Sequence, residues 1–214
     1  ANIAILGATV SIGLSTLEVV QANAGRLGVV ALAANSSAAE LLEQAQRFNP
    51  RWLALADAEA AAEVDAEQLP KGVQLLVGQA GLIEIAQSPA VDVIVSAIVG
   101  SAGIHSTWAA VEAGKTIALA NKETLVVAGP LVMSRCQQTG ARIIPIDSEH
   151  SAIFQALAAG RREEVQRIIL TASGGPFRNH THDELASVTR EQALAHPTWE
   201  MGPKITIDSA TMMN

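Results

Sequence analysis

Two acidic residues separated by a single serine, Asp147 and Glu149, open the segment 147–150, directly after an apolar run. Carboxylates at positions i and i+2 of a turn suit Mg²⁺ or Mn²⁺, which keep coordination positions for substrate oxygens. Zinc fits less well, because the single cysteine, Cys136, lies elsewhere. The same residues also suit a helix start, with Asp147 or Ser148 as N-cap and Glu149 favouring the dipole. The segment thus has two interpretations, a metal site and a helix start.

A second polar cluster, Ala120–Glu123, follows another apolar run. Ligands of parallel α/β sheets gather beyond the carboxyl ends of the strands. Lys122 is therefore well placed to meet an anion or a developing alkoxide. A solvated surface pair of Lys122 and Glu123 is the alternative.

Hydroxyl groups beside glycines form a third, more dispersed cluster. Ser173 precedes two glycines and offers a hydroxyl with nearby backbone donors, as a phosphate-binding nest does. His196 and Trp199 lie in a segment punctuated by proline and glycine, which predicts a mobile flap whose tryptophan covers a substrate. A lone tryptophan is more often a core residue, and this alternative stays open.

The elements that must position these residues follow an α/β pattern over the first 145 residues. Short β-branched runs alternate with alanine-rich helical stretches, which is typical of a doubly wound, mostly parallel sheet. The expected strands are Asn2–Leu6, Leu27–Ala33, Trp52–Ala56, Val73–Val77, Val91–Ser96, Thr116–Leu119 and Arg142–Pro145. The expected helices are Ile12–Gln21, Ala38–Phe48, Ala58–Ala66, Leu82–Gln87, His105–Ala113 and Gly129–Thr139.

The organisation changes near residue 146, so we expect one domain over residues 1–145 and the start of an α+β domain over 146–214. Helical spacing covers Ser148–Ala159, and Val165–Ala172 and Ile205–Asp208 are predicted as strands. Capping-box patterns at Thr181 and Thr189 predict two further helix starts.

A glycine turn follows the first expected strand and opens a helix, in the segment Gly7–Gly13. Such a turn aims backbone N–H groups and a positive helix end at a pyrophosphate, which predicts a dinucleotide site. A tight connection without a ligand is the alternative. After the second strand, Asn35, Ser36 and Ser37 replace the acidic residue that favours a free ribose 2′-hydroxyl, so the loop leans towards NADP. Ser36 or Ser37 would equally cap the next helix.

Composition narrows the class of partner. The net charge of −7 argues against nucleic acid, whose phosphates need a basic face. We find no apolar run long enough for a membrane span and no signal peptide. A single cysteine fits a reducing compartment, so we expect a cytoplasmic protein.

Taken together, these segments resemble the 1-deoxy-D-xylulose 5-phosphate reductoisomerase family over the whole chain. The resemblance rests on motifs in order, namely Gly7-Ala-Thr-Val-Ser-Ile-Gly13, Ala97-Ile-Val-Gly100, Ala120-Asn-Lys-Glu123, Asp147-Ser-Glu-His150, Thr171-Ala-Ser-Gly-Gly-Pro-Phe177, His196-Pro-Thr-Trp199 and Asp208-Ser-Ala-Thr-Met-Met-Asn214. It implies an NADPH-dependent enzyme that rearranges and reduces 1-deoxy-D-xylulose 5-phosphate to 2-C-methyl-D-erythritol 4-phosphate, in non-mevalonate isoprenoid biosynthesis, and that acts as a homodimer.

The resemblance also implies residue roles. The expected NADPH contacts are Gly7, Thr9, Val10, Ser11, Ile12, Asn35, Ser36, Ser37, Asn121, Glu123 and Gly202. The expected metal ligands are Asp147 and Glu149. Lys122, Asp147, Glu149 and His196 are the expected catalytic residues. The expected contacts with the sugar-phosphate substrate are Lys122, Ser148, Glu149, Ser173, His196, Trp199, Ser209 and Asn214.

Three departures from the family pattern qualify these roles. The family has glycine where Val10 stands, and a β-branched residue there would crowd the pyrophosphate and would not readily adopt a positive φ. The loop around Ser36 lacks the basic residue of relatives. The family continues with a Lys and a Glu that complete the site, so we expect the C-terminal part to be missing and this chain alone to have little activity.

Two other interpretations remain at this point. A dinucleotide-dependent dehydrogenase without metal chemistry shares the first domain but gives no reason for the pair Asp147 and Glu149. A regulatory module that binds the nucleotide without catalysis is the non-enzymatic alternative.

Overall fold

The computed structural model describes residues 1–211. The chain divides into two compact units, and the division in the sequence falls between Ser151 and Ala152. The domain boundary expected from the sequence lies after residue 145. The division by compactness instead falls inside helix α7 (Ser148–Ala158). Each unit is described by itself below.

The first unit is built on a seven-stranded sheet in the order β4-β3-β2-β1-β5-β6-β7, and every recorded pairing is parallel. The strands are β1 (Asn2–Leu6), β2 (Gly28–Ala34), β3 (Trp52–Leu55), β4 (Gln74–Val77), β5 (Val93–Ser96), β6 (Thr116–Leu119) and β7 (Arg142–Pro145). The prediction of a doubly wound sheet is confirmed. The order reverses between β1 and β5, which is the switch point where such sheets bind ligands.

The register aligns the carboxyl ends of four strands. Leu6 of β1 pairs with Ser96 of β5, Ser96 pairs with Leu119 of β6, and Leu119 pairs with Pro145 of β7. The residues that follow these four ends therefore lie along one edge of the sheet. These are the segments that the sequence analysis singles out for chemistry.

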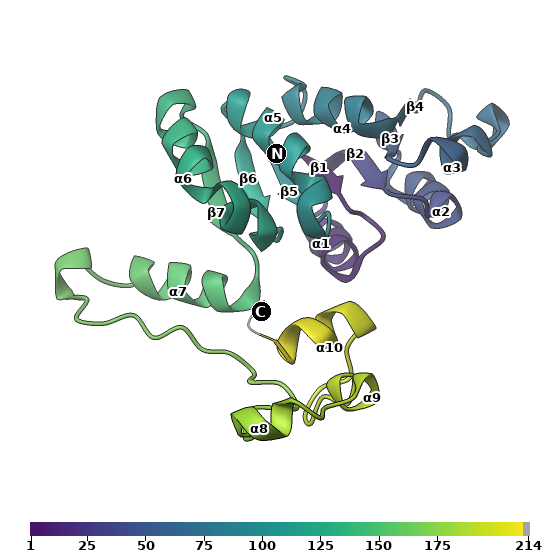
Figure 1. Ribbon diagram of the computed structural model, residues 1–214. Coiled ribbons are helices and arrows are strands. Elements are labelled where there is room, and N and C mark those ends of the chain that lie inside the picture. The colour runs from purple at the N-terminus through teal and green to yellow at the C-terminus, as the bar shows by residue number, and fades with distance from the viewer. Residues whose placement is uncertain (212–214) are drawn as a thin grey trace. The chain divides into compact units, whose positions relative to one another are not determined.

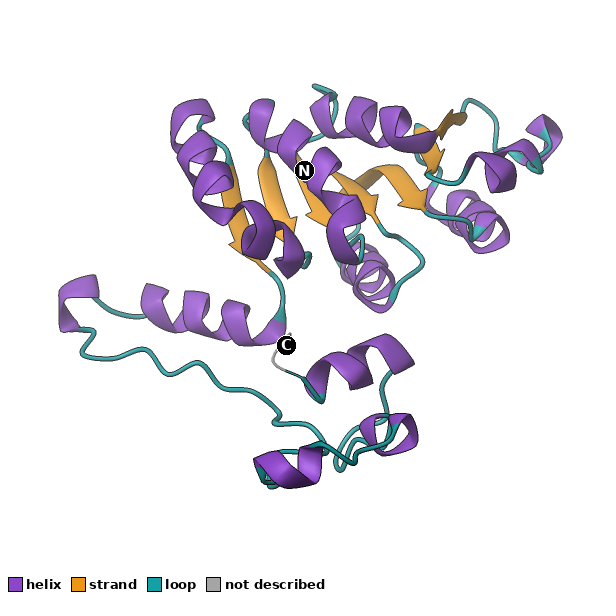
Figure 2. Cartoon of the chain, in the orientation of Figure 1, coloured by secondary structure: helices purple, strands orange, loops and turns teal. Residues whose placement is uncertain are grey.

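Helices cover both faces of the sheet (Figures 1 and 2). One apolar layer joins the strands to α4 (Gly78–Gln87), α5 (Ile104–Glu112) and α6 (Lys122–Thr139). The other joins them to α1 (Ser11–Ala22), α2 (Ala38–Phe48) and α3 (Ala58–Ala62). Strands buried on both faces need near-continuous apolar runs, which is why the strands were recognisable in the sequence.

Helix α6 begins at Lys122, well before the expected start at Gly129. Asn121 is its N-cap, and the helix is kinked at the non-helical Ala128, beside Pro130. Proline removes a helix hydrogen bond and bends the axis. The polar cluster at 120–123 was interpreted only as a strand-end loop, and its capping role was missed.

The second unit holds short helices joined by extended chain. These are the remainder of α7, then α8 (His182–Leu185), α9 (Arg190–Ala193) and α10 (Pro203–Ser209). Both capping boxes are confirmed: Thr181 and Glu184 bond reciprocally, as do Thr189 and Gln192. These bonds satisfy backbone donors at each helix start.

Two strand predictions in this unit are wrong. Val165–Ala172 is extended but pairs with no other strand among residues 1–211, and Ile168, Ile169 and Leu170 are exposed. A β-branched run becomes a strand only where a neighbour bonds to its backbone. Ile205–Asp208 lies in α10 instead, because Pro203 opens the helix and Lys204 pairs with Asp208 one turn on at 2.6 Å.

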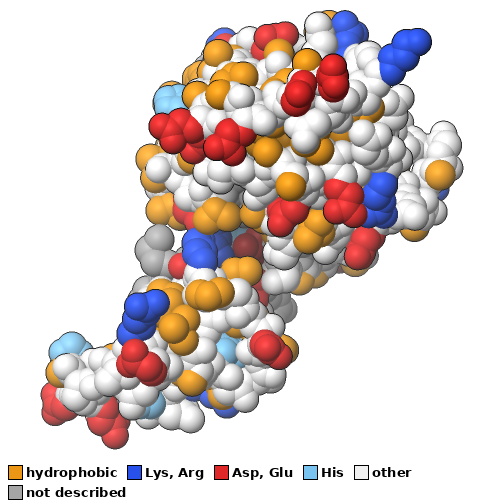
Figure 3. Space-filling view, turned by 90° about the vertical axis from the view of Figure 1, so that its right-hand side faces the viewer, with side chains coloured by type: hydrophobic (Ala, Val, Ile, Leu, Met, Phe, Trp, Pro, Cys, Tyr) orange, Lys and Arg blue, Asp and Glu red, His pale blue; other side chains and the backbone are white. Residues whose placement is uncertain are grey.

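Acidic, basic and hydrophobic side chains are interspersed over the face of the molecule in Figure 3. Within the described part of the chain, no helix has both the length and the apolar character needed to cross a membrane.

Candidate functional site

The turn after β1 lies at the switch point of the sheet and is shaped by Gly7. Its φ is +98°, and an added Cβ would lie 2.8 Å from the carbonyl carbon and oxygen of Ala97, after β5. The N–H groups of Gly7 and Ala8 both donate to the carbonyl of Ala33, at 2.9 and 2.8 Å. Only glycine fits this close backbone approach. The turn thus has the tight geometry that a dinucleotide pyrophosphate requires.

The start of α1 follows directly and presents its first backbone donors at the end of the turn. Val10 is the N-cap residue, with φ −91° and ψ 166°, and Ser11 begins the helix. The expected backbone strain at Val10 is therefore wrong, because this extended conformation is open to every residue. Val10 is exposed, with 36% of its surface accessible. Crowding of a pyrophosphate by this side chain stays a prediction.

The start of α2 carries the residues expected at the adenosine end. Ser37 is the N-cap residue, but its side chain makes no capping hydrogen bond. Ser36 and Ser37 line a cavity of ≈ 400 Å³ whose wall also includes the acidic residues Glu40 and Glu63. The hydroxyls and the first-turn N–H groups of α2 are suitable donors for a phosphate, whereas the two carboxylates oppose it.

Asn121 ties the loop after β5 to the start of α6. Its Nδ2 donates to the carbonyls of Ile98 and Gly100, the latter at 2.7 Å, while its Oδ1 accepts from the N and Oγ1 of Thr124, at 2.9 and 2.6 Å. Asn121 is only 2% exposed. The amide is thus fully engaged within the protein. Because Ile98 also borders Gly7, the same side chain links the turn after β1 to Lys122.

The two polar clusters at the ends of β6 and β7 meet. Lys122 Nζ lies 3.5 Å from Asp147 Oδ2, and His150 Nδ1 lies 3.3 Å from Asp147 Oδ1. Ser148 Oγ donates to Glu149 Oε2 at 2.6 Å. Both Lys122 and Asp147 are partly accessible, with side chains 22% and 21% exposed.

These oxygens suit a hard divalent cation such as Mg²⁺ or Mn²⁺, since both carboxylates stand at one strand end and remain reachable from solvent. Residues 1–211 contain no group of three or more His, Cys, Asp or Glu side chains arranged for a metal ion. Asp147 and Glu149 thus form a pair rather than a larger cluster among the described residues, and their role as metal ligands stays a prediction.

In the second unit, the Ser173–Gly175 loop packs against the end of α10. Gly174 and Gly175 have φ values of +76° and +58°, and an added Cβ on Gly175 would lie 2.1 Å from the carbonyl oxygen of Ser209. Ser209 donates its hydroxyl to the carbonyl of Thr206 at 2.8 Å. Ser173 Oγ is buried and has no partner within the described chain. The contact brings two of the serines expected to bind phosphate into one neighbourhood.

His196 is oriented by the backbone of its own turn. Its Nδ1 accepts hydrogen bonds from the N–H groups of Thr198 and Trp199, at 3.1 and 3.0 Å, and its ring stacks on that of Trp199 with centroids 5.1 Å apart. With Nδ1 as acceptor, the neutral ring carries its proton on Nε2. That atom is buried without a partner among residues 1–211. His196 thus presents a single N–H donor, and both rings line a cavity of ≈ 380 Å³.

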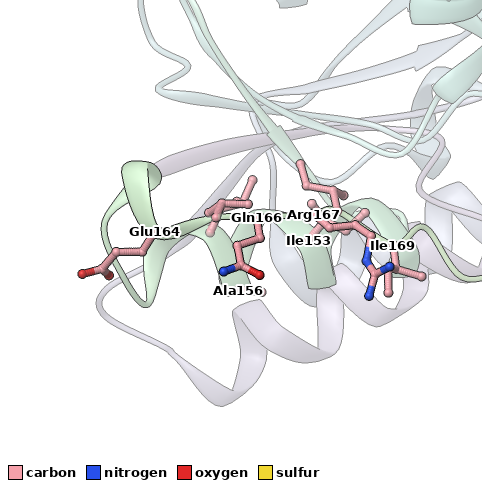
Figure 4. Close-up of a pocket in the computed structure, with 9 residues that line it drawn as sticks. Ile153, Ala156, Glu164, Gln166, Arg167 and Ile169 are labelled. Atoms are coloured by element: carbon pink, nitrogen blue, oxygen red, sulfur yellow. The ribbon is translucent and has the colours of Figure 1, made fainter.

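Another cavity of the second unit holds none of the expected site residues. It has a volume of ≈ 830 Å³ and lies between α7 and the 164–169 segment, with Ile153, Ala156 and Arg167 in its wall (Figure 4). Its wall combines apolar side chains of α7 and of the unpaired extended segment with the polar side chains of Glu164, Gln166 and Arg167.

The remaining predicted residues are placed as follows. Gly202 is the N-cap residue of α10, and Asn214 lies outside the described residues. One polar residue that the sequence analysis missed is Gln44, which is buried and bonds to the turn after β1. The sequence did contain a sign of this buried amide, because Gln44 interrupts the apolar face of α2 that includes Leu41 and Ala45.

Comparison with known proteins shows the family of the chain. The family model described as 1-deoxy-D-xylulose 5-phosphate reductoisomerase matches residues 3–129, and the model of the C-terminal domain of that enzyme matches residues 143–214. A curated 1-deoxy-D-xylulose 5-phosphate reductoisomerase from Heliobacterium modesticaldum is 54% identical over 215 residues, covering 100% of this chain and 55% of the relative.

Two solved structures are similar along the chain. A DOX-P reductoisomerase in complex with NADPH, fosmidomycin and magnesium has a TM-score of 0.87 at 43% identity, covering 100% of this chain and 55% of that one. The Zymomonas mobilis enzyme in complex with NADPH has a TM-score of 0.88 at 44% identity, covering 99% and 54%. The chain spans about half the length of these relatives. It belongs to the 1-deoxy-D-xylulose 5-phosphate reductoisomerase family.

Proposed function

We propose that this chain supplies the cofactor-binding part and the beginning of the catalytic part of an enzyme that converts 1-deoxy-D-xylulose 5-phosphate to 2-C-methyl-D-erythritol 4-phosphate. The observation that carries the proposal is the contact between Lys122 and Asp147 at neighbouring strand ends. It puts a cation and a carboxylate together at the edge where parallel sheets bind ligands. Family membership and the ligands of the solved relatives support the same reaction.

The cofactor end is proposed to bind NADPH, which supplies the hydride for the reduction. Backbone donors of the Gly7 turn, from Thr9 to Ile12, bind the pyrophosphate, and the Asn35–Ser37 loop binds the adenosine 2′-phosphate. Asn121, Glu123 and Gly202 complete the proposed contacts. Asn121 has the additional task of holding the loop after β5 against the turn.

At the catalytic end, Asp147 and Glu149 are proposed to hold Mg²⁺ or Mn²⁺. The bound cation supplies Lewis-acid stabilisation of charge on the substrate oxygens during the carbon–carbon rearrangement. Lys122 and Ser148 contact the substrate beside it. Lys122, which lies 3.5 Å from Asp147, would turn its ammonium group to the substrate if Asp147 held a cation.

The second unit is proposed to bind the rest of the sugar phosphate. Ser173, Ser209 and Asn214 bind the phosphate group, and His196 donates its Nε2–H to a substrate oxygen. Trp199 lies over the substrate and excludes water. Ser173 Oγ and His196 Nε2 are buried and lack a hydrogen-bond partner within residues 1–211, which supports these roles, because buried polar atoms are normally satisfied and a ligand would satisfy them.

The test is NADPH oxidation by the full-length enzyme with 1-deoxy-D-xylulose 5-phosphate and Mg²⁺. Asp147→Asn and Glu149→Gln remove one charge each and are expected to abolish metal-dependent turnover. Glu43→Gln, on the exposed side of α2, serves as the control and leaves turnover unchanged. Unchanged turnover in Asp147→Asn refutes the metal assignment, and an unmodified enzyme that fails to oxidise NADPH refutes the function. The 214-residue chain assayed alongside tests whether it is active alone.

We further propose that the full-length enzyme acts in the cytoplasm as a homodimer, without nucleic acid or membrane partners. The free, buried Cys136 supports a reducing compartment. Sedimentation equilibrium of the full-length enzyme tests the dimer, and a monomeric mass refutes it.

A further inference from the structure

Gln44 reaches from the middle of α2 to the turn after β1. Its Nε2 donates to the carbonyl oxygen of Ala8 at 3.0 Å, and the residue is only 6% exposed. Its Oε1 is buried too and has no hydrogen-bond partner within residues 1–211. The amide keeps this orientation at the cost of an unsatisfied oxygen, so the bond to Ala8 decides how the side chain lies.

The bond to Ala8 also fixes the N–H group of Thr9. The described chain has no cis peptide bond, so the carbonyl of Ala8 and the N–H of Thr9 point in opposite directions across one rigid plane. Ala8 is fully buried, and its carbonyl points inward to Gln44. The Thr9 N–H therefore points away from Gln44, on the side of the turn that leads towards the exposed Val10.

The other side of the Ala8 residue is held as well. Its N–H donates to the carbonyl of Ala33, at the end of β2. Ala8 is thus bonded to β2 through its N–H and to α2 through its carbonyl. The peptide plane between Ala8 and Thr9 has little freedom to rotate while both bonds persist.

We propose that Gln44 is a positioning residue for cofactor binding, which orients the Thr9 N–H towards the pyrophosphate of the dinucleotide. The inference rests on the proposed function only in that NADPH binds at this turn. The same helix carries Ser37 at its start, so the adenosine end of the cofactor serves as an internal reference for the effect at the pyrophosphate. Donors fixed in advance bind an anion without a further ordering cost.

The test compares two ligands on the full-length enzyme. Gln44→Met keeps the side-chain length and removes the donor. We expect NADPH to bind about tenfold more weakly, because one oriented hydrogen bond to a charged group is lost. Adenosine 2′-monophosphate, which has no pyrophosphate, should bind as before. At saturating NADPH the kcat should be unchanged, so the defect appears in the KM for NADPH. Gln46→Met makes the same change at an exposed position of α2 and should alter neither affinity.

A second variant, Gln44→Glu, distinguishes the loss of the hydrogen bond to Ala8 from a general packing defect. A protonated carboxyl donates to Ala8 as the amide does, whereas a carboxylate repels that carbonyl, and burial raises the pKa of such a carboxyl. NADPH affinity relative to the unmodified enzyme should therefore be nearly restored at low pH and fall as pH rises.

The possible results distinguish a failure of the Gln44 proposal from a failure of the proposed function. Equal weakening of both ligands in Gln44→Met would mean that α2 has simply moved, and unchanged NADPH affinity would mean that the turn needs no such support; either result overturns the proposal. Absence of NADPH binding in the unmodified enzyme would instead overturn the proposed function itself.

Discussion

Gly175 and Ser209 lie so close that a Cβ atom on Gly175 would be 2.1 Å from the carbonyl oxygen of Ser209. The two residues are far apart in sequence, yet the glycine loop after Ser173 is shaped by the end of α10. Ser173 and Ser209, which are proposed to bind one phosphate group, are thereby held near each other by a backbone contact between Gly175 and Ser209.

This contact predicts that Gly175→Ala weakens substrate binding. An alanine at φ +58° is strained by ~1 kcal/mol, and the clash with Ser209 forces the loop or α10 to move. We expect the KM for 1-deoxy-D-xylulose 5-phosphate to rise at least tenfold in the full-length enzyme, with the Kd for NADPH unchanged. Gly160→Ala is the control, because its Cβ would make only an ordinary contact, 3.5 Å from Glu164. An unaffected KM in Gly175→Ala would contradict the role of this packing.

Asn121→Ala is expected to destabilise the first unit by ~2–4 kcal/mol, since it removes a helix cap and leaves two carbonyls of the partly buried loop after β5 without a donor. Urea denaturation of the full-length enzyme measures the loss as a lower midpoint. Asn23→Ala, which removes one exposed bond to Val19, should cost less than ~1 kcal/mol. Similar midpoints for the two variants would show that the Asn121 network contributes little.

His196 has two separable tasks, and two substitutions divide them. His196→Asn places an oxygen where Nδ1 accepts the N–H groups of Thr198 and Trp199, so the turn is kept while the Nε2–H donor is lost. His196→Ala loses both. We expect kcat/KM to fall by about 10²-fold in both variants, with a drop in Tm only in His196→Ala. Normal activity in His196→Asn would show that the Nε2–H is not used.

An ion pair between α5 and α6 makes stability depend on pH. Arg135 donates two hydrogen bonds of 2.7 Å to the carboxylate of Glu112, which lowers the pKa of Glu112 below its ordinary value. A lowered folded-state pKa gives stability that is present above the unfolded pKa and is lost as pH falls through the folded value. Glu112→Gln should therefore lower the Tm at pH 7, and the difference from the unmodified enzyme should shrink as pH falls below the ordinary glutamate pKa and through the lowered one. A constant difference across this range would contradict the ion-pair contribution.

Ser36→Arg tests the adenosine end. The cavity beside Ser36 is lined by Glu40 and Glu63, and a guanidinium there would pair with a 2′-phosphate. We expect NADPH to bind several-fold more tightly and NADH to be unaffected, with the gain reduced at high salt. Ser36→Gln, which has similar length and no charge, is the matched control. An equal gain for NADH would place the loop away from the 2′-phosphate.

Much of the first unit was predictable from the sequence. All seven strands were expected, because strands buried on both faces must be continuously apolar. The ends of three helices, α1, α2 and α5, were expected to within a residue or two, and for α2 the amphipathic pattern is the reason. The polar clusters at 120–123 and 147–150 were expected at strand ends for the same reason. The contact between Lys122 and Asp147 then follows from strand order and register, which local sequence does not state.

Other features were decided only by tertiary structure. Two segments rich in β-branched residues did not become strands, Val165–Ala172 and Ile205–Asp208. The first has no strand partner in the described chain, and the second lies in helix α10, which begins at Pro203. Gln44 and Asn121 carry polar side chains whose partners lie on other elements, Ala8 and Ile98. Local sequence fixes which residues must be buried, because burial has a period along the chain. It does not fix which distant backbone group a buried polar side chain meets, because that depends on how the elements pack.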